Sequence, residues 1–164
     1  MTEAALKADA AGFQLIIHAV GDQTVREVLN IYEKARNMNG SRDSRHRIEH
    51  VEVAHPDDQP RFAALNVIPS MTPVHLTADV DEYIRPRLGE SRGYGYAWRN
   101  FISYGAHLCF GSDYPAIDLK EPEPLKQIYA AVTRTQPGAI GARPWHPEQC
   151  LSVAEAIRCY TLEG

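Results

Sequence analysis

The sequence predicts an α/β fold built from parallel βα units. Four short apolar segments, each followed by a helix-like segment, alternate along the chain, and such alternation is typical of parallel strands joined by right-handed crossovers. Polar side chains stand where these segments end: His18 on the first, His50 within the second and Asp113 after the fourth. The motifs GxGxxG and GxxxxGKS are missing from the sequence, which argues against a dinucleotide-binding or P-loop fold.

The first half of the chain predicts two strands and two helices. A short helix over residues 2–11 ends at Gly12, and the apolar run over residues 13–17 predicts the first strand. Apolar residues at helical spacing then predict a helix over residues 23–38. The run RIEHVEV at residues 47–53 predicts the second strand.

The second half continues the same alternation. The remaining expected elements, in order, are a helix beginning near Pro56, a strand at 67–71, a loop at 72–95, a helix at 96–104, a strand at 107–110, and helices at 124–134 and 153–160. Pro69 argues against full pairing of the third strand. A loop as long as 72–95 is usually functional or mobile. Ser152 and Glu155 form a capping-box pattern for the last helix.

Composition places the chain among ordinary globular proteins. Its 164 residues are 44% hydrophobic and 23% charged, with a net charge of −4, so neither nucleic acid nor an anionic membrane surface is expected as a partner. No apolar run approaches the ~18 residues that a membrane span requires. The three cysteines show no CxxC spacing, which favours reduced thiols in a cytoplasmic protein.

His18, His50 and Asp113 form a candidate metal site. In a (β/α) barrel the carboxyl ends of all strands open on one face, so these residues would converge although they are far apart in sequence. Two imidazoles and a carboxylate suit a divalent ion, most of all Zn²⁺. Such an ion lowers the pKa of bound water from about 15.7 to roughly 7. Asp113 could then act as general base and acid in hydrolysing an amide-like carbon–nitrogen bond.

Other interpretations of these residues remain open. Asp113 could instead form an Asx-type turn before Tyr114, or act with His18 as an acid–base pair in a barrel enzyme without metal. His75, Trp98 and Tyr114 are candidates for lining a substrate pocket, and solvated or packing roles are equally open for them. Strand alternation places Glu49 on the face opposite His50, so Glu49 is not a candidate.

Several short motifs carry a resemblance to a known family. These are IHAVGD at 17–22, RIEHVEV at 47–53, GSDYP at 111–115 and LSVAEAIRCYT at 151–161. In combination they resemble the amidohydrolase superfamily, and within it the branch of N-substituted formamide deformylase-like and exoenzyme regulatory proteins. The resemblance covers nearly the whole chain.

The resemblance implies a metal-dependent (β/α)8 barrel in which His18, His50 and Asp113 match ligands on the fifth, sixth and eighth strands. The family's His-x-His on the first strand and its acidic or carboxylated-lysine ligand on the fourth have no counterpart here. A complete barrel needs ~250 residues. Residues 1–164 are therefore expected to form one domain, the C-terminal half-barrel of about four βα units.

Two functions from different classes follow. The first is a metal-dependent amidohydrolase acting on a small amide-like substrate, represented here by a fragment with an incomplete active site. The second is a catalytically silent half-barrel that serves as a folding or oligomerisation unit. Homo-oligomers are expected because two strand edges would be unpaired. The apolar barrel interior, namely Ile16, Val51, Ile68 and Cys109 or Phe110, would also be uncovered.

Overall fold

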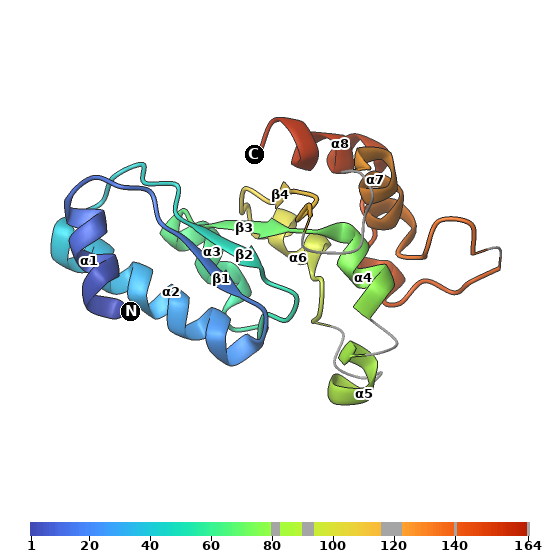
Figure 1. Cartoon of the computed structure of the whole chain (residues 1–164), viewed down its shortest axis with the longest axis horizontal. Coiled ribbons are helices and arrows are strands. Elements are labelled where there is room, and N and C mark those ends of the chain that lie inside the picture. Colours follow the sequence, from blue (N-terminus) through green and yellow to red (C-terminus); the bar gives the residue numbers. More distant parts are fainter. Residues whose placement is uncertain (80–82, 90–93, 116–122, 140, 164) are drawn as a thin grey trace.

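A four-stranded parallel sheet forms the centre of the molecule (Figure 1). The computed structural model describes residues 1–79, 83–89, 94–115, 123–139 and 141–163. The strands are β1 (Ile16–Ala19), β2 (Arg47–His50), β3 (Ile68–Met71) and β4 (Cys109–Phe110), and they neighbour one another in sequence order. Each pair is parallel, so the predicted fold class, an α/β fold of (β/α)-barrel type, is confirmed.

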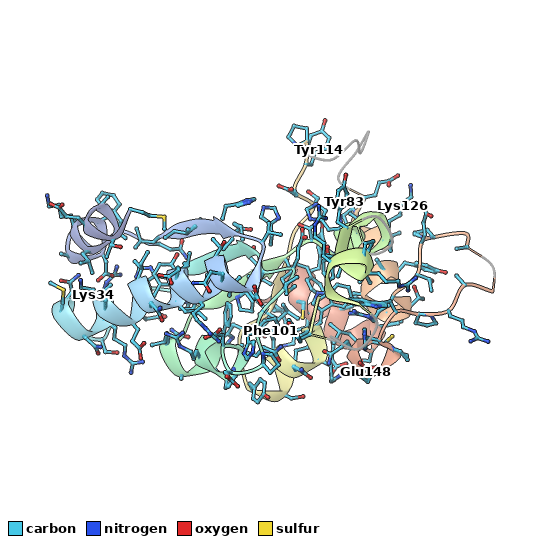
Figure 2. The ribbon with its side chains drawn as sticks, turned by 90° about the horizontal axis from the view of Figure 1, so that it is seen from below. Lys34, Tyr83, Phe101, Tyr114, Lys126 and Glu148 are labelled. Atoms are coloured by element: carbon cyan, nitrogen blue, oxygen red, sulfur yellow. The ribbon has the colours of Figure 1, made fainter. Side chains whose placement is uncertain are left out.

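Helices connect the strands and cover the sheet. They are α1 (Thr2–Ala10), α2 (Asp22–Asn39), α3 (Gln59–Leu65), α4 (Pro73–Asp79), α5 (Arg85–Leu88), α6 (Trp98–Ser103), α7 (Pro124–Thr133) and α8 (Val153–Thr161), with a 3-10 turn at Pro147–Gln149. Figure 2 shows α2, α3 and α6 together on one side of the sheet. α4 packs against α7, and α8 packs against both α7 and β4.

The predicted apolar stripe of α2 is buried against the sheet. Val25 and Leu29 have no exposed surface, and Tyr32 is 2% exposed. The Tyr32 hydroxyl donates a hydrogen bond of 2.7 Å to the carbonyl oxygen of Arg47, which ties α2 to β2. Burying apolar area of this kind contributes roughly 25 cal/mol per Å², so this stripe sets how the first βα unit packs.

The third strand and the last helix follow the sequence patterns. Pro69 lies inside β3 and pairs in register with Ile48 of β2, so the strand forms despite the proline. The capping box at α8 is present: Ser152 Oγ accepts a hydrogen bond from the backbone N–H of Glu155, and the Glu155 side chain accepts one from the backbone N–H of Ser152.

Two expected elements differ from those observed. The strand expected over residues 47–53 ends at His50, because His50 and Val51 adopt φ angles of 76° and 48°, which extended backbone cannot accommodate. The loop expected at 72–95 contains α4 and α5. Proline is tolerated in the first turn of a helix, and Pro73 begins α4 in this way.

The expectation of an uncovered apolar interior is largely wrong. Ile16 is 58% exposed, whereas Val51, Ile68, Cys109 and Phe110 are each at most 5% exposed. β1 and β4 are the outer strands of the described sheet, so the exposed apolar surface on the sheet concentrates at β1. Within the described ranges, none of the helices combines the length and apolar character that a membrane crossing requires.

Candidate metal centre

Four side chains of metal-binding type gather at the carboxyl end of the sheet. His18 lies near the end of β1 and His50 is the last residue of β2. Their ring centroids are 4.3 Å apart. The ring of His75, from α4, stacks on that of His50 at 5.5 Å with 11° between the planes. His75 Nε2 in turn lies 3.5 Å from Asp113 Oδ2. The three residues predicted as ligands therefore share one end of the sheet.

The backbone at the end of β2 determines where His50 points. The strand register pairs His18 with Glu49, so regular alternation would place Glu49 beside His18 and turn His50 away. The positive φ of His50 departs from that alternation, and its ring meets the ring of His18 instead. Left-handed backbone at a non-glycine residue costs of order 1–3 kcal/mol and is concentrated at functional sites.

His75 connects two carboxylates. Its Nδ1 lies 3.2 Å from Glu52 Oε1 in a hydrogen bond, and its Nε2 faces Asp113. One donor atom from each of His50, Glu52 and His75 lies within 4.8 Å of the others. Sequence reasoning missed Glu52. Strand alternation could not have found it, because the backbone leaves the extended conformation at His50 and Val51.

The turn after β4 is formed by Ser112 and leaves Asp113 available. The backbone N–H of Tyr114 donates to Ser112 Oγ at 3.3 Å, so a serine supplies the turn hydrogen bond considered for Asp113 from sequence. Asp113 has a φ of 52°. Its carboxylate is 30% exposed and faces His75. This geometry places a half-buried carboxylate beside the imidazole cluster.

The electrostatic surroundings favour neutral His50. Burial lowers the pKa of His50, and the neighbouring His18 and His75 rings lower it further, whereas Asp113 and Glu52 oppose the change. A neutral imidazole keeps the lone pair that a metal ion requires. Imidazole nitrogens together with carboxylate oxygens are also the donor set that divalent transition ions prefer. The residues present therefore fit a divalent metal.

The three residues predicted to contact substrate, Trp98, Tyr114 and His75, lie in different surroundings in the structure. Trp98 has no exposed surface. It packs against the rings of Phe110 and Tyr96 and the guanidinium of Arg134, which makes it a core residue without surface for a substrate. Tyr114 is 51% exposed and projects outward from the molecule (Figure 2). His75 is 5% exposed and belongs to the imidazole cluster.

A mainly apolar cavity of about 430 Å³ adjoins the cluster through Glu52. Val20 and Val53, which follow β1 and β2, contribute to its wall together with Tyr83 and Ile84. Sequence reasoning placed Tyr83 and Ile84 in a segment expected to be a functional or mobile loop, but it assigned none of these four residues to a pocket. Pockets of this size and character accommodate small organic molecules.

Comparison with known proteins agrees with the resemblance seen in the motifs. The model of the amidohydrolase family matches residues 1–164. The chain is 34% identical to the protein LONG AFTER FAR-RED 3 of Arabidopsis thaliana over 161 residues, which is 97% of this chain and 27% of that protein. It is 27% identical to the N-substituted formamide deformylase of Arthrobacter pascens, over 96% of this chain and 28% of the deformylase.

A solved structure supports the same relationship. The crystal structure of a metal-dependent hydrolase from Pyrococcus furiosus is 26% identical and superimposes with a TM-score of 0.77, covering 99% of this chain and 31% of that one. The chain thus spans between about a quarter and a third of the length of these relatives. On the family match across its whole length, the chain belongs to the amidohydrolase family.

Proposed function

We propose that this chain supplies strands five to eight of a metal-dependent amidohydrolase barrel that hydrolyses carbon–nitrogen bonds of small amide-like molecules. The observation that carries the proposal is the gathering of His18, His50, His75 and Asp113 at the carboxyl end of a parallel sheet. In barrels of this class, the active site lies at that end of the strands.

His18, His50 and Asp113 are the proposed ligands of a divalent ion, with Zn²⁺ as the metal. Such an ion supplies a water molecule of lowered pKa and polarises the scissile carbonyl group. Asp113, as proposed general base, accepts a proton from the attacking water and returns it to the leaving nitrogen. The half-buried position of its carboxylate beside His75 suits proton transfer to a substrate atom.

The cavity beside Glu52 is the proposed substrate pocket. Its mainly apolar wall, which includes Tyr83 and Ile84, suits the organic substituent of an N-acyl or N-formyl amine. The name of the Arthrobacter pascens relative describes a deformylase of N-substituted formamides, which supports this substrate class. Further metal ligands are expected from a part of the barrel outside these 164 residues.

The test uses both this chain and the deformylase relative. Turnover of N-formyl and N-acyl amines in the presence of Zn²⁺ is measured for the 164-residue chain, where little or none is expected because part of the ligand set is missing. In the relative, the residue at the position equivalent to Asp113 is replaced by asparagine, which keeps the shape of an aspartate and removes the proton acceptor. We expect kcat to fall by ~10²–10⁴-fold.

In this chain His107 is exposed and pairs with Glu163 away from the cluster. Substitution by glutamine at the equivalent position of the relative is the matched control, and it should leave kcat unchanged. An aspartate variant with unchanged kcat would refute the role assigned to Asp113. Robust turnover by the 164 residues alone would show that no further ligands are needed.

A further inference from the structure

We propose that His75 is an additional metal ligand through Nε2, and that Glu52 is the residue that positions it. This inference rests on the metal-dependent function proposed above and adds a ligand from α4 to the set from the strand ends. It reassigns His75, which the sequence offered only as a candidate for contacting substrate.

The first observation is an unpartnered nitrogen. His75 is 5% exposed, and its Nε2 is buried without a hydrogen-bond partner among the residues that the structure describes. Buried polar atoms are nearly always satisfied, because leaving one unpaired costs about 1–3 kcal/mol. A buried imidazole nitrogen aimed at a cluster of histidines and a carboxylate therefore indicates a missing partner.

The second observation is the hydrogen bond on the other side of the ring. Nδ1 of His75 donates to Glu52 Oε1 at 3.2 Å, and Glu52 is 8% exposed. A neutral ring that carries its proton on Nδ1 has its lone pair on Nε2, which faces Asp113. Histidines that ligate metals characteristically donate their other N–H to a carboxylate, and this bond fixes both tautomer and orientation.

The third observation is the spacing of the donor atoms. His75 Nε2 and Asp113 Oδ2 are 3.5 Å apart. Two atoms that each lie about 2.1 Å from an ion in tetrahedral geometry are separated by ~3.4 Å. The parallel His50 ring, 5.5 Å from that of His75, brings a further imidazole to the same place. The spacing is thus compatible with Nε2 and Asp113 as neighbouring ligands of one ion.

Glu52 itself is better suited to support than to ligation. Its Oε1 already accepts the Nδ1–H hydrogen bond of His75, and an ion placed between these two atoms would displace that proton. Nε2, in contrast, has no proton to lose in this tautomer. The acidic side chain facing Nε2 is Asp113, which is also a proposed ligand.

The first experiment titrates Zn²⁺ into the ¹⁵N-labelled 164-residue chain and follows the imidazole nitrogens by long-range ¹H–¹⁵N NMR. We expect His75 to carry its proton on Nδ1 before addition. Its Nε2 resonance should then shift on addition together with those of His18 and His50. Shifts at His18 and His50 without one at His75 would overturn the inference and leave the proposed function intact. No shift at any of the three would count against both.

The second experiment measures Zn²⁺ affinity by competition with a chromophoric chelator. His75→Gln should weaken binding at least about tenfold, and Glu52→Ala should weaken it by ~10–100-fold, the usual effect of removing the partner of a ligating histidine. Glu52→Gln, which keeps an acceptor for Nδ1–H, should recover part of that loss. The control His107→Gln removes an exposed histidine outside the cluster and should bind Zn²⁺ as the unaltered chain does. Equal affinity for His75→Gln and His107→Gln would refute the assignment.

Discussion

The ion pair between Arg99 and Glu155 offers a quantitative test of how α8 is held against α6. Nη1 and Nη2 of Arg99 lie 2.6 and 2.8 Å from Oε1 and Oε2 of Glu155, and the backbone N–H of Ser152 donates to the same carboxylate at 2.8 Å. Because α8 also packs on β4, whose end leads to Asp113, this interaction supports the last strand of the site.

Hydrogen bonds from Arg99 and Ser152 lower the pKa of Glu155 from 4.5 to about 2. At about 1.36 kcal/mol per pH unit, this lowering corresponds to ~3.4 kcal/mol. The two side chains are 34% and 31% exposed, so solvent screening reduces the expected contribution to ~1–2 kcal/mol. Since the folded-state pKa is depressed, this stability is present above pH 4.5 and is lost as the pH falls towards 2.

The assay is urea denaturation of the unaltered chain and of Glu155→Gln across this pH range. At pH 7 we expect the variant to be less stable by ~1–2 kcal/mol, and we expect the difference to narrow as the pH falls from 4.5 towards 2. Glu148→Gln is the control, since that side chain is 58% exposed and pairs with His146. If the stability difference between the unaltered chain and Glu155→Gln at pH 7 were unchanged near pH 2, the role given to the ionised carboxylate would be refuted.

Three further outcomes are expected. The chain should self-associate through the outer strand β1, where Ile16 is 58% exposed, because an open strand edge templates further pairing; a stable monomer in light scattering at micromolar concentration would contradict this. After extensive dialysis, elemental analysis should find less than one zinc ion per chain, because the His18 side chain is exposed and no side-chain hydrogen bond to a described residue fixes its ring. Two tightly held ions would show instead that no ligand is missing. Phe62→Ala should lower the free energy of unfolding by ~3–5 kcal/mol, because Phe62 is fully buried and its ring lies edge-on to that of Phe101, with 4.9 Å between the ring centroids. If urea denaturation shows a loss below about 1 kcal/mol, the α3–α6 contact does not stabilise the fold.

Local patterns in the sequence were sufficient for the architecture. The alternation of strands and helices, the apolar stripe of α2 and the capping box of α8 each depend on residues a few positions apart, and the structure contains all three. The parallel arrangement then brings the ends of β1 and β2 together, so the proximity of His18 and His50 could also be predicted.

The composition of the site beyond these residues was decided by tertiary structure. His75 enters the cluster because α4 follows β3 and packs against α7, and Glu52 meets it because the backbone turns at His50 and Val51. Trp98, proposed from the sequence as a pocket residue, instead belongs to the core, because it is fully buried beside Phe110. The sequence by itself determined which metal-binding side chains the chain carries and which strand ends they follow. Their final directions depend on φ angles and on packing between distant segments, which no local pattern encodes.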